Sequence, residues 1–93
     1  RMIEMQYPMK GLTRMRWGSF SATISSPDEK AWHIVVKEDD KVVWDGLKYI
    51  SAEQVPAVIE EKIRAQYRPY KWAVVDGKER SLATFFVFET VAN

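Results

Sequence analysis

His33 is the only histidine in the chain, and imidazole is the side chain best suited to general acid–base catalysis near neutral pH. It alternates with Trp32 and Ile34 within the stretch 31–37. Because neighbouring residues of a strand point to opposite faces, we expect His33 on the less buried face. A general base also needs an orienting partner, and the residues next to His33 supply none, although a distant carboxylate could do so. We therefore expect an ordinary sheet-surface histidine, no catalytic residue and no enzyme.

A run of carboxylates, Glu38-Asp39-Asp40 with Asp45 nearby, is the candidate for metal binding. Calcium loops place oxygen ligands at alternating positions around a central glycine and end on a bidentate glutamate. This run has neither that length nor that order. The chain also lacks cysteine, which excludes disulfides and thiolate zinc sites. We expect a solvated hairpin tip, no bound metal and no cofactor.

The sequence also lacks the motifs of nucleophilic catalysis and of phosphate binding. The serines fall at strand or turn positions without the flanking glycines of a nucleophile elbow. The four glycines, at positions 11, 18, 46 and 77, are too scattered to form a phosphate-binding loop.

Basic residues interleaved with aromatic residues form the strongest ligand-binding pattern. Single-stranded nucleic acid is bound in this way, because cations contact its phosphates and aromatic rings stack on its bases. The net charge of +1 is modest for such a protein. Binding of single-stranded RNA or DNA is therefore the alternative function. Its candidate residues are Lys10, Arg14, Arg16, Arg68, Tyr70 and Lys71.

The length of 93 residues is enough for one hydrophobic core, and the apolar fraction of 46% is typical of a soluble globular domain. No apolar run approaches the roughly 18 residues of a membrane span, and no signal-peptide pattern opens the chain. We expect a cytoplasmic protein with no membrane contact. Arg1 precedes Met2, so the native start is expected at Met2, Met5 or Met9.

Residues 1–16 show no clean periodicity and contain Pro8, Gly11 and all four methionines. We interpret this segment as an irregular N-terminal arm or a short edge strand, ahead of a single α+β domain at 17–93. Alternating apolar residues within that domain predict five strands. They are expected at 17–25, 31–37, 42–45, 70–75 and 82–91, with a bulge or bend at Gly46 before 47–50 and a tight turn at Asp76-Gly77.

One helix is predicted between the third and fourth strands. Apolar residues recur every four positions from Val55 to Tyr67, and Ser51 with Gln54 has the spacing of a capping box. Pro56 favours a regular helix that begins near residue 55 after a looser first turn, and Pro69 ends it.

These elements predict an α+β fold in which a five-stranded antiparallel sheet, ordered β-β-β-α-β-β along the chain, carries one helix on one face. A single helix covers only one face, so the other must meet a partner or solvent. We expect Leu82, Phe86 and Phe88 to complete the core. The expected function is that of a small non-enzymatic protein-binding module, which is an adaptor, an inhibitor or a self-associating domain. The partner is another protein or a second copy. Candidate binding residues on the face without the helix are Trp17, His33, Val35, Phe85 and Val87.

Overall fold

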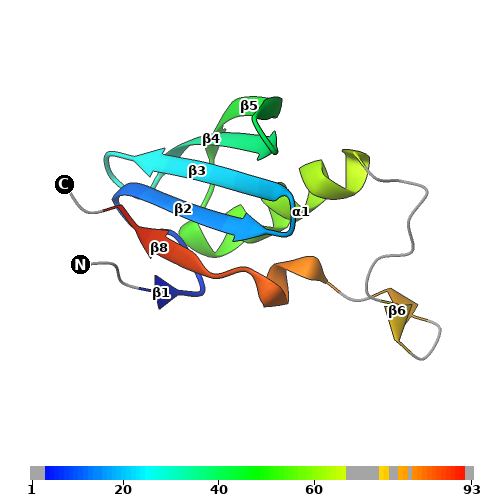
Figure 1. Ribbon diagram of the computed structural model, residues 1–93. Helices are drawn as coiled ribbons and strands as arrows, with labels where there is room; N and C mark the ends of the chain where they lie inside the picture. Colours follow the sequence, from blue (N-terminus) through cyan, green and yellow to red (C-terminus); the bar gives the residue numbers. More distant parts are fainter. Residues whose placement is uncertain (1–3, 67–73, 76–77, 80, 92–93) are drawn as a thin grey trace.

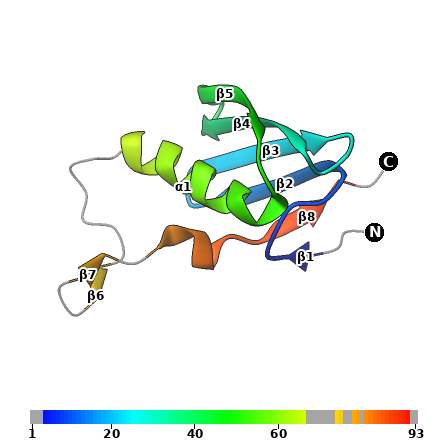
Figure 2. The same cartoon turned by 180° about the vertical axis from the view of Figure 1, so that it is seen from behind.

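The computed structural model describes residues 4–66, 74–75, 78–79 and 81–91. Its main element is an open antiparallel sheet of six strands in the order β1-β8-β2-β3-β4-β5, with helix α1 lying across one face (Figures 1 and 2). The strands are β1 (Glu4–Met5), β2 (Gly11–Trp17), β3 (Phe20–Ser26), β4 (Ala31–Glu38), β5 (Lys41–Tyr49) and β8 (Phe88–Thr90). The remaining elements are η1 (Ala52–Gln54), α1 (Val55–Gln66), η2 (Leu82–Phe85) and a separate hairpin of β6 (Val74–Val75) and β7 (Lys78–Glu79). The predicted α+β class is confirmed, but the sheet has six strands rather than five.

The core lies between the sheet and α1, and it follows the alternation of the sequence. On β4, Trp32, Ile34 and Val36 are fully buried, as predicted. The indole nitrogen of Trp32 donates a hydrogen bond of 2.9 Å to the carbonyl of Ile50, so its one polar group is satisfied inside the core. The other buried apolar residues are Met15, Phe20, Ala22, Ile24, Val55, Ile59, Ile63, Leu82, Phe86 and Phe88.

The start of the helix agrees with its sequence signals. The capping box of Ser51 and Gln54 is present, and the Ser51 N–H donates to the Gln54 side-chain oxygen at 2.9 Å. Residues 52–54 form a 3₁₀ turn, and the regular helix begins at Val55. Pro56 therefore sits in the first helical turn, where its missing N–H costs little. Tyr67 and Pro69 lie outside the described residues.

The N-terminal segment requires a correction, because residues 11–16 are not irregular. They form most of β2, which pairs with β3 on one side and β8 on the other. Gly18, at φ 61°, and Ser19 make a tight turn that joins Trp17 to its partner Phe20. The strand predicted at 17–25 thus begins only at Phe20, and Trp17 ends β2. The alternation of apolar and polar residues along β2 was hidden because Thr13, which points into the core, is a polar residue.

The strands predicted at 70–75 and 82–91 also differ from the structure. Residues 70–73 and the Asp76-Gly77 turn lie outside the described residues, and Val74–Val75 pairs with Lys78–Glu79 instead of joining the main sheet. Residues 82–85 form the 3₁₀ helix η2 instead of a strand. Ser81 caps η2, since its hydroxyl accepts a hydrogen bond of 3.2 Å from the Ala83 N–H.

The strands predicted on either side of Gly46 form one continuous strand, β5. Gly46 pairs regularly with Ile34, and the bulge lies instead near Val43, where the register with β4 shifts. A Cβ atom at position 46 would clash with the indole ring of Trp44. Glycine is therefore required at this position by the close approach of a side chain, not by a bend in the strand.

Candidate functional site

The sheet face opposite α1, which we call the uncovered face, carries the candidate site. Successive residues of each strand alternate between this face and the core, so the strand pairing fixes which side chains are neighbours on it. Three cross-strand rows result from that register. They are Leu12–Ser25–His33–Leu47, Arg14–Thr23–Val35–Asp45 and Arg16–Ser21–Lys37–Val42.

One end of the uncovered face contains an apolar hollow of about 480 Å³. Leu12 from β2 and Leu47 from β5 lie at its sides and are 45% and 52% exposed. Pro27, Ala31 and His33 complete most of its lining. We call this feature the apolar hollow. Its walls leave apolar surface in water, which is the condition for binding an apolar side chain of another molecule.

His33 stands at the apolar hollow and is oriented by a carboxylate from the next strand. Its Nε2 lies 2.7 Å from Oδ1 of Asp45, and the two side chains are 51% and 57% exposed. Asp45 pairs with Val35, so the partner reaches His33 diagonally across β4 and β5. The distant partner considered from the sequence therefore exists. Because both groups are open to solvent, this pair contributes only about 0–1 kcal/mol to stability.

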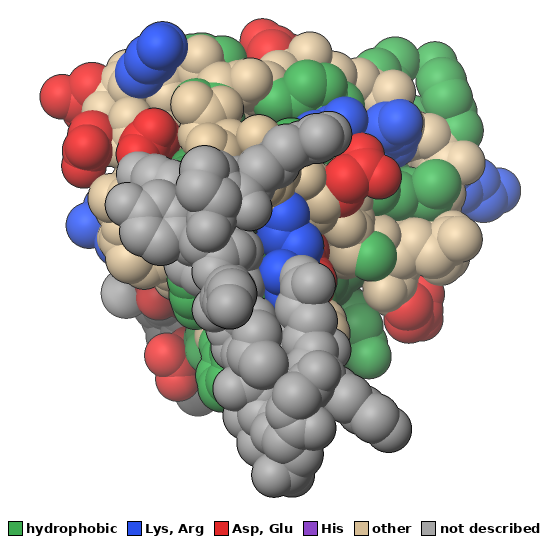
Figure 3. Space-filling model, turned by 90° about the vertical axis from the view of Figure 1, so that its right-hand side faces the viewer, with side chains coloured by type: hydrophobic (Ala, Val, Ile, Leu, Met, Phe, Trp, Pro, Cys, Tyr) green, Lys and Arg blue, Asp and Glu red, His purple; other side chains and the backbone are tan. Residues whose placement is uncertain are grey.

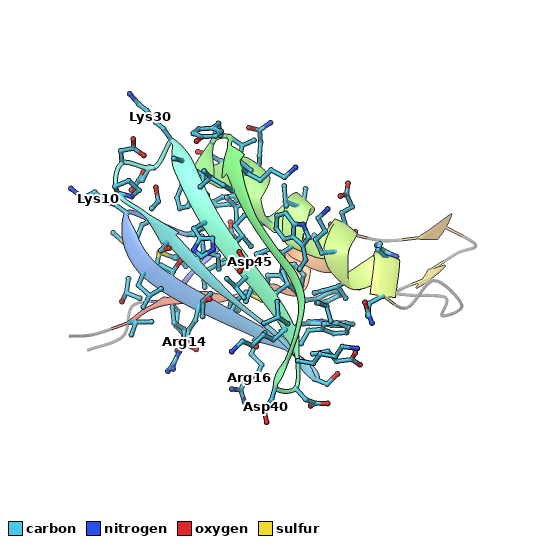
Figure 4. All side chains as sticks on the ribbon, turned by 90° about the horizontal axis from the view of Figure 1, so that it is seen from above. Lys10, Arg14, Arg16, Lys30, Asp40 and Asp45 are labelled. Atoms are coloured by element: carbon cyan, nitrogen blue, oxygen red, sulfur yellow. The ribbon has the colours of Figure 1, made fainter. Side chains whose placement is uncertain are left out.

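The other end of the uncovered face is basic and polar. Arg14 and Arg16 project from β2 on this face (Figure 4), and Lys37 lies in the same cross-strand row as Arg16. A depression of about 520 Å³ lies between β2 and β3 and is lined by both arginines with Ser21, Thr23 and Glu89. We call it the basic depression. Glu89 offsets part of its charge, because its carboxylate lies 4.0 Å from the Arg14 guanidinium.

The predicted protein-binding residues do not all share one face. His33 and Val35 lie on the uncovered face as expected. Trp17 does not, because it follows Thr13 and Met15 at every second position of β2 and therefore points to the helix side, where it packs against the core. That placement corrects the sequence-based prediction, which assigned Trp17 to the following strand.

Phe85 and Val87 are exposed, at 57% and 46%. Phe85 belongs to η2, so the strand alternation that was expected to place it beside Val87 does not apply to it. Leu82, Phe86 and Phe88 are buried, as predicted.

The predicted nucleic-acid residues divide into two groups. Arg14 and Arg16 lie together on the uncovered face. Lys10 is exposed just before β2, and its backbone N–H donates a hydrogen bond of 2.9 Å to the Glu29 carboxylate. The remaining three, Arg68, Tyr70 and Lys71, lie outside the described residues.

Sequence reasoning missed Leu12, Leu47 and Tyr49. Leu12 was assigned to an irregular arm, although it lies in β2. Asp45, Leu47 and Tyr49 are alternate residues of β5 and lie on the same face, so alternation along a continuous strand would have predicted their position. The signal was obscured by the bulge at Val43, which changes the parity between Val42 and Asp45.

Within the residues that the structure describes, no group of acidic or histidine side chains is arranged to hold a metal ion. None of the helices in the same described part of the chain has the length and apolar character needed to cross a membrane. Comparison with protein-family models, curated proteins and solved structures finds no match to this chain.

Proposed function

We propose that this chain is a small non-enzymatic protein-binding module that binds its partner on the uncovered face. The observation that carries the proposal is the apolar hollow, where Leu12 and Leu47 leave about half of their surface in water. Complete burial of one aliphatic side chain contributes about 1.5–3 kcal/mol, so a partner residue seated there would gain substantial binding free energy. An adaptor, an inhibitor and a self-associating domain all use such a surface.

The surroundings of the apolar hollow suit a protein interface. Its rim carries the His33–Asp45 pair and Ser25, which offer hydrogen bonds around an apolar centre. Tyr49 lies at the end of β5 and is 75% exposed, which makes it a candidate aromatic anchor. The exposure of His33 and Asp45 supports a role in hydrogen bonding to a partner, since acid–base catalysis gains most in a site that excludes water.

The proposal is tested by capture from lysate of the source cells, with nuclease present and quantitative mass spectrometry as the readout. Leu12→Asp places a charge beside the apolar hollow and should deplete specific partners about tenfold or more, because a desolvated charge in an interface is costly. Tyr7→Asp is the matched control. Tyr7 is 44% exposed, close to the 45% of Leu12, but it lies beside Pro56 and Phe86 on the helix side. Equal recovery of proteins by the wild type and the Leu12→Asp variant would contradict the proposal.

Binding of single-stranded RNA or DNA is the second candidate, and the basic depression favours it. Arg14, Arg16 and Lys37 present three cations around the hydroxyls of Ser21 and Thr23 on one face. The described uncovered face offers little aromatic surface for base stacking beyond Tyr49, because Trp17 lies on the helix side. Figure 3 views the molecule from one end, and the described side chains visible there carry both positive and negative charges. This mixture favours nucleic-acid binding less than a uniformly basic surface would.

Oligonucleotide titrations over a salt series test this second candidate. If phosphates bind the basic depression, affinity should fall with rising salt, and Arg16→Ala should weaken binding and reduce the salt slope by about one. Lys30→Ala, in the exposed turn between β3 and β4, is the control for a general loss of charge. Undetectable affinity, or affinity independent of salt, would remove nucleic acid from consideration.

A further inference from the structure

The two edges of the main sheet differ greatly in length. One edge is β1, with only two residues, and the other is β5, with nine. Figure 4 looks down on the β5 side, and no described segment lies along the outer edge of that strand. An edge strand presents a row of unpaired N–H and C=O groups, and proteins normally shorten, charge or cover such edges. A nine-residue open edge is therefore a candidate for pairing with another strand.

The protective features of β5 leave most of its edge available. The bulge near Val43 disturbs only the beginning of the strand, and Trp44 to Tyr49 pairs regularly with Val36 to Ala31. The strand contains no proline. Its exposed side chains include Val42, Leu47 and Tyr49, at 48%, 52% and 75%. Of the six regular residues, Leu47 and Tyr49 present exposed apolar or aromatic side chains, and Asp45 and Lys48 carry the charges. Two exposed apolar or aromatic side chains on a regular edge favour strand addition.

We propose that the outer edge of β5 pairs antiparallel with β5 of a second copy, around a two-fold axis at Leu47. This register places Leu47 opposite Leu47 of the copy and Asp45 opposite its Tyr49. An axis at Asp45 would oppose two carboxylates, and like charges directly across a sheet are destabilising. The Leu47 register instead opposes two exposed leucines and places no like charges directly opposite each other. The strand can therefore pair with itself, as a two-fold interface requires. The inference uses the backbone edge of β5 and shares only Leu47 with the apolar hollow, so different experiments test the two proposals.

The expected dimer is weak and reversible. Pairing from Asp45 to Tyr49 is short, so the buried area belongs to the class below about 1,200 Å² that is typical of transient complexes. The paired sheets would bring both apolar hollows toward the same axis, since Leu47 borders the hollow in each copy.

Disulfide trapping tests this register, because the chain has no cysteine of its own. Directly opposite residues of an antiparallel pair have Cα atoms about 4.5–5.5 Å apart, within the range that a disulfide spans. Leu47→Cys should therefore cross-link in a glutathione redox buffer. Tyr49→Cys is the matched control on the same strand, and its parent side chain is the more exposed of the two. Its two copies would be displaced by four residues, or about 14 Å, which is too far for a disulfide.

The account predicts that Leu47→Cys forms a covalent dimer roughly tenfold faster than Tyr49→Cys. Equal rates, or a faster Tyr49→Cys reaction, would overturn this pairing. Sedimentation of the wild-type chain over a concentration series needs no substitution and should show a mass that rises toward the dimer. A constant monomer mass at all concentrations would also overturn the proposal. The comparison of Leu12→Asp with Tyr7→Asp is a separate measurement, because Leu12 lies on the β2 side of the apolar hollow and is separated from β5 by β3 and β4.

Discussion

Glu60 on α1 holds Ser81 and the start of η2 against the helix. Its Oε1 accepts hydrogen bonds from the Ser81 hydroxyl at 2.7 Å and from the Ala83 N–H at 2.8 Å. Its Oε2 accepts from Nε of Arg64 at 2.8 Å, one helical turn later. One carboxylate thus joins elements that are more than twenty residues apart in sequence. Because η2 leads into β8, this contact helps to position the strand that pairs with β2.

Removal of the Glu60 carboxylate should destabilise the fold in a pH-dependent way. Burial raises the pKa of Glu60, but hydrogen bonds from Ser81, Arg64 and Ala83 outweigh that effect and hold the pKa below its ordinary value of 4.5. Because the pKa is lower in the folded state, the Glu60 carboxylate stabilises the fold at pH values above its ordinary pKa. This stabilisation is lost as the pH falls through the folded-state pKa. Glu60→Ala should lower the free energy of unfolding by about 1–3 kcal/mol at neutral pH.

Urea unfolding of the wild type and the Glu60→Ala variant over a pH series measures this effect. The difference between their free energies of unfolding should be largest above pH 4.5 and should shrink on acidification. Glu60→Gln keeps a carbonyl acceptor for Ser81 and should lose less stability than Glu60→Ala. A difference that is constant with pH would contradict the assignment of the carboxylate as the stabilising group.

Gly46 and Trp44 should be energetically coupled. Because a Cβ at position 46 would meet the Trp44 ring, Gly46→Ala should destabilise the fold by about 1–3 kcal/mol through overpacking. The ring is also held from α1, where the Lys62 ammonium lies 4.6 Å from its centroid. In a Trp44→Leu background the same glycine substitution should cost less. A double-mutant cycle by chemical denaturation measures the coupling, and additive effects would refute it.

Asp28 should fix the turn that borders the apolar hollow. Its Oδ1 accepts from the N–H groups of Ala31 and Lys30, at 3.1 Å and 2.9 Å, and these bonds lower the pKa of the carboxyl below 3.8. Asp28→Ala should increase amide exchange at Lys30 and Ala31, as measured by nuclear magnetic resonance. Asp28→Asn keeps an acceptor oxygen and should preserve most of the protection. In the wild type, protection of these two amides from exchange should persist above pH 3.8 and weaken as the pH falls through the lowered pKa of Asp28. Equal exchange in both variants would show that the acceptor does not hold the turn.

The sequence was informative where the hydrophobic period was clean. Alternation around Ile34 predicted both faces of β4, and the spacing of Ser51 and Gln54 with Pro56 predicted where the helix begins. These signals are local, because each depends on residues within one or two turns or strand repeats.

The remaining features depend on contacts between distant segments. β2 was missed because its inward face mixes Thr13 with Met15, and only pairing with β3 and β8 makes it a strand. The orientation of His33 by Asp45 depends on the β4–β5 register, which the bulge near Val43 shifts. Residues 82–85 read as a strand by alternation, whereas capping by Ser81 and the Glu60 contact hold them as η2.

The most direct test of the protein-binding account is photocrosslinking from the uncovered face. A photoreactive amino acid replaces Leu12 beside the apolar hollow, and a second version carries it at Tyr7 on the helix side. Both are irradiated in cells of the source organism and treated with nuclease before purification. The account predicts a discrete protein adduct from position 12 that is absent or much weaker from position 7. No adduct from position 12, the same adducts from both positions, or an adduct removed by nuclease would contradict it.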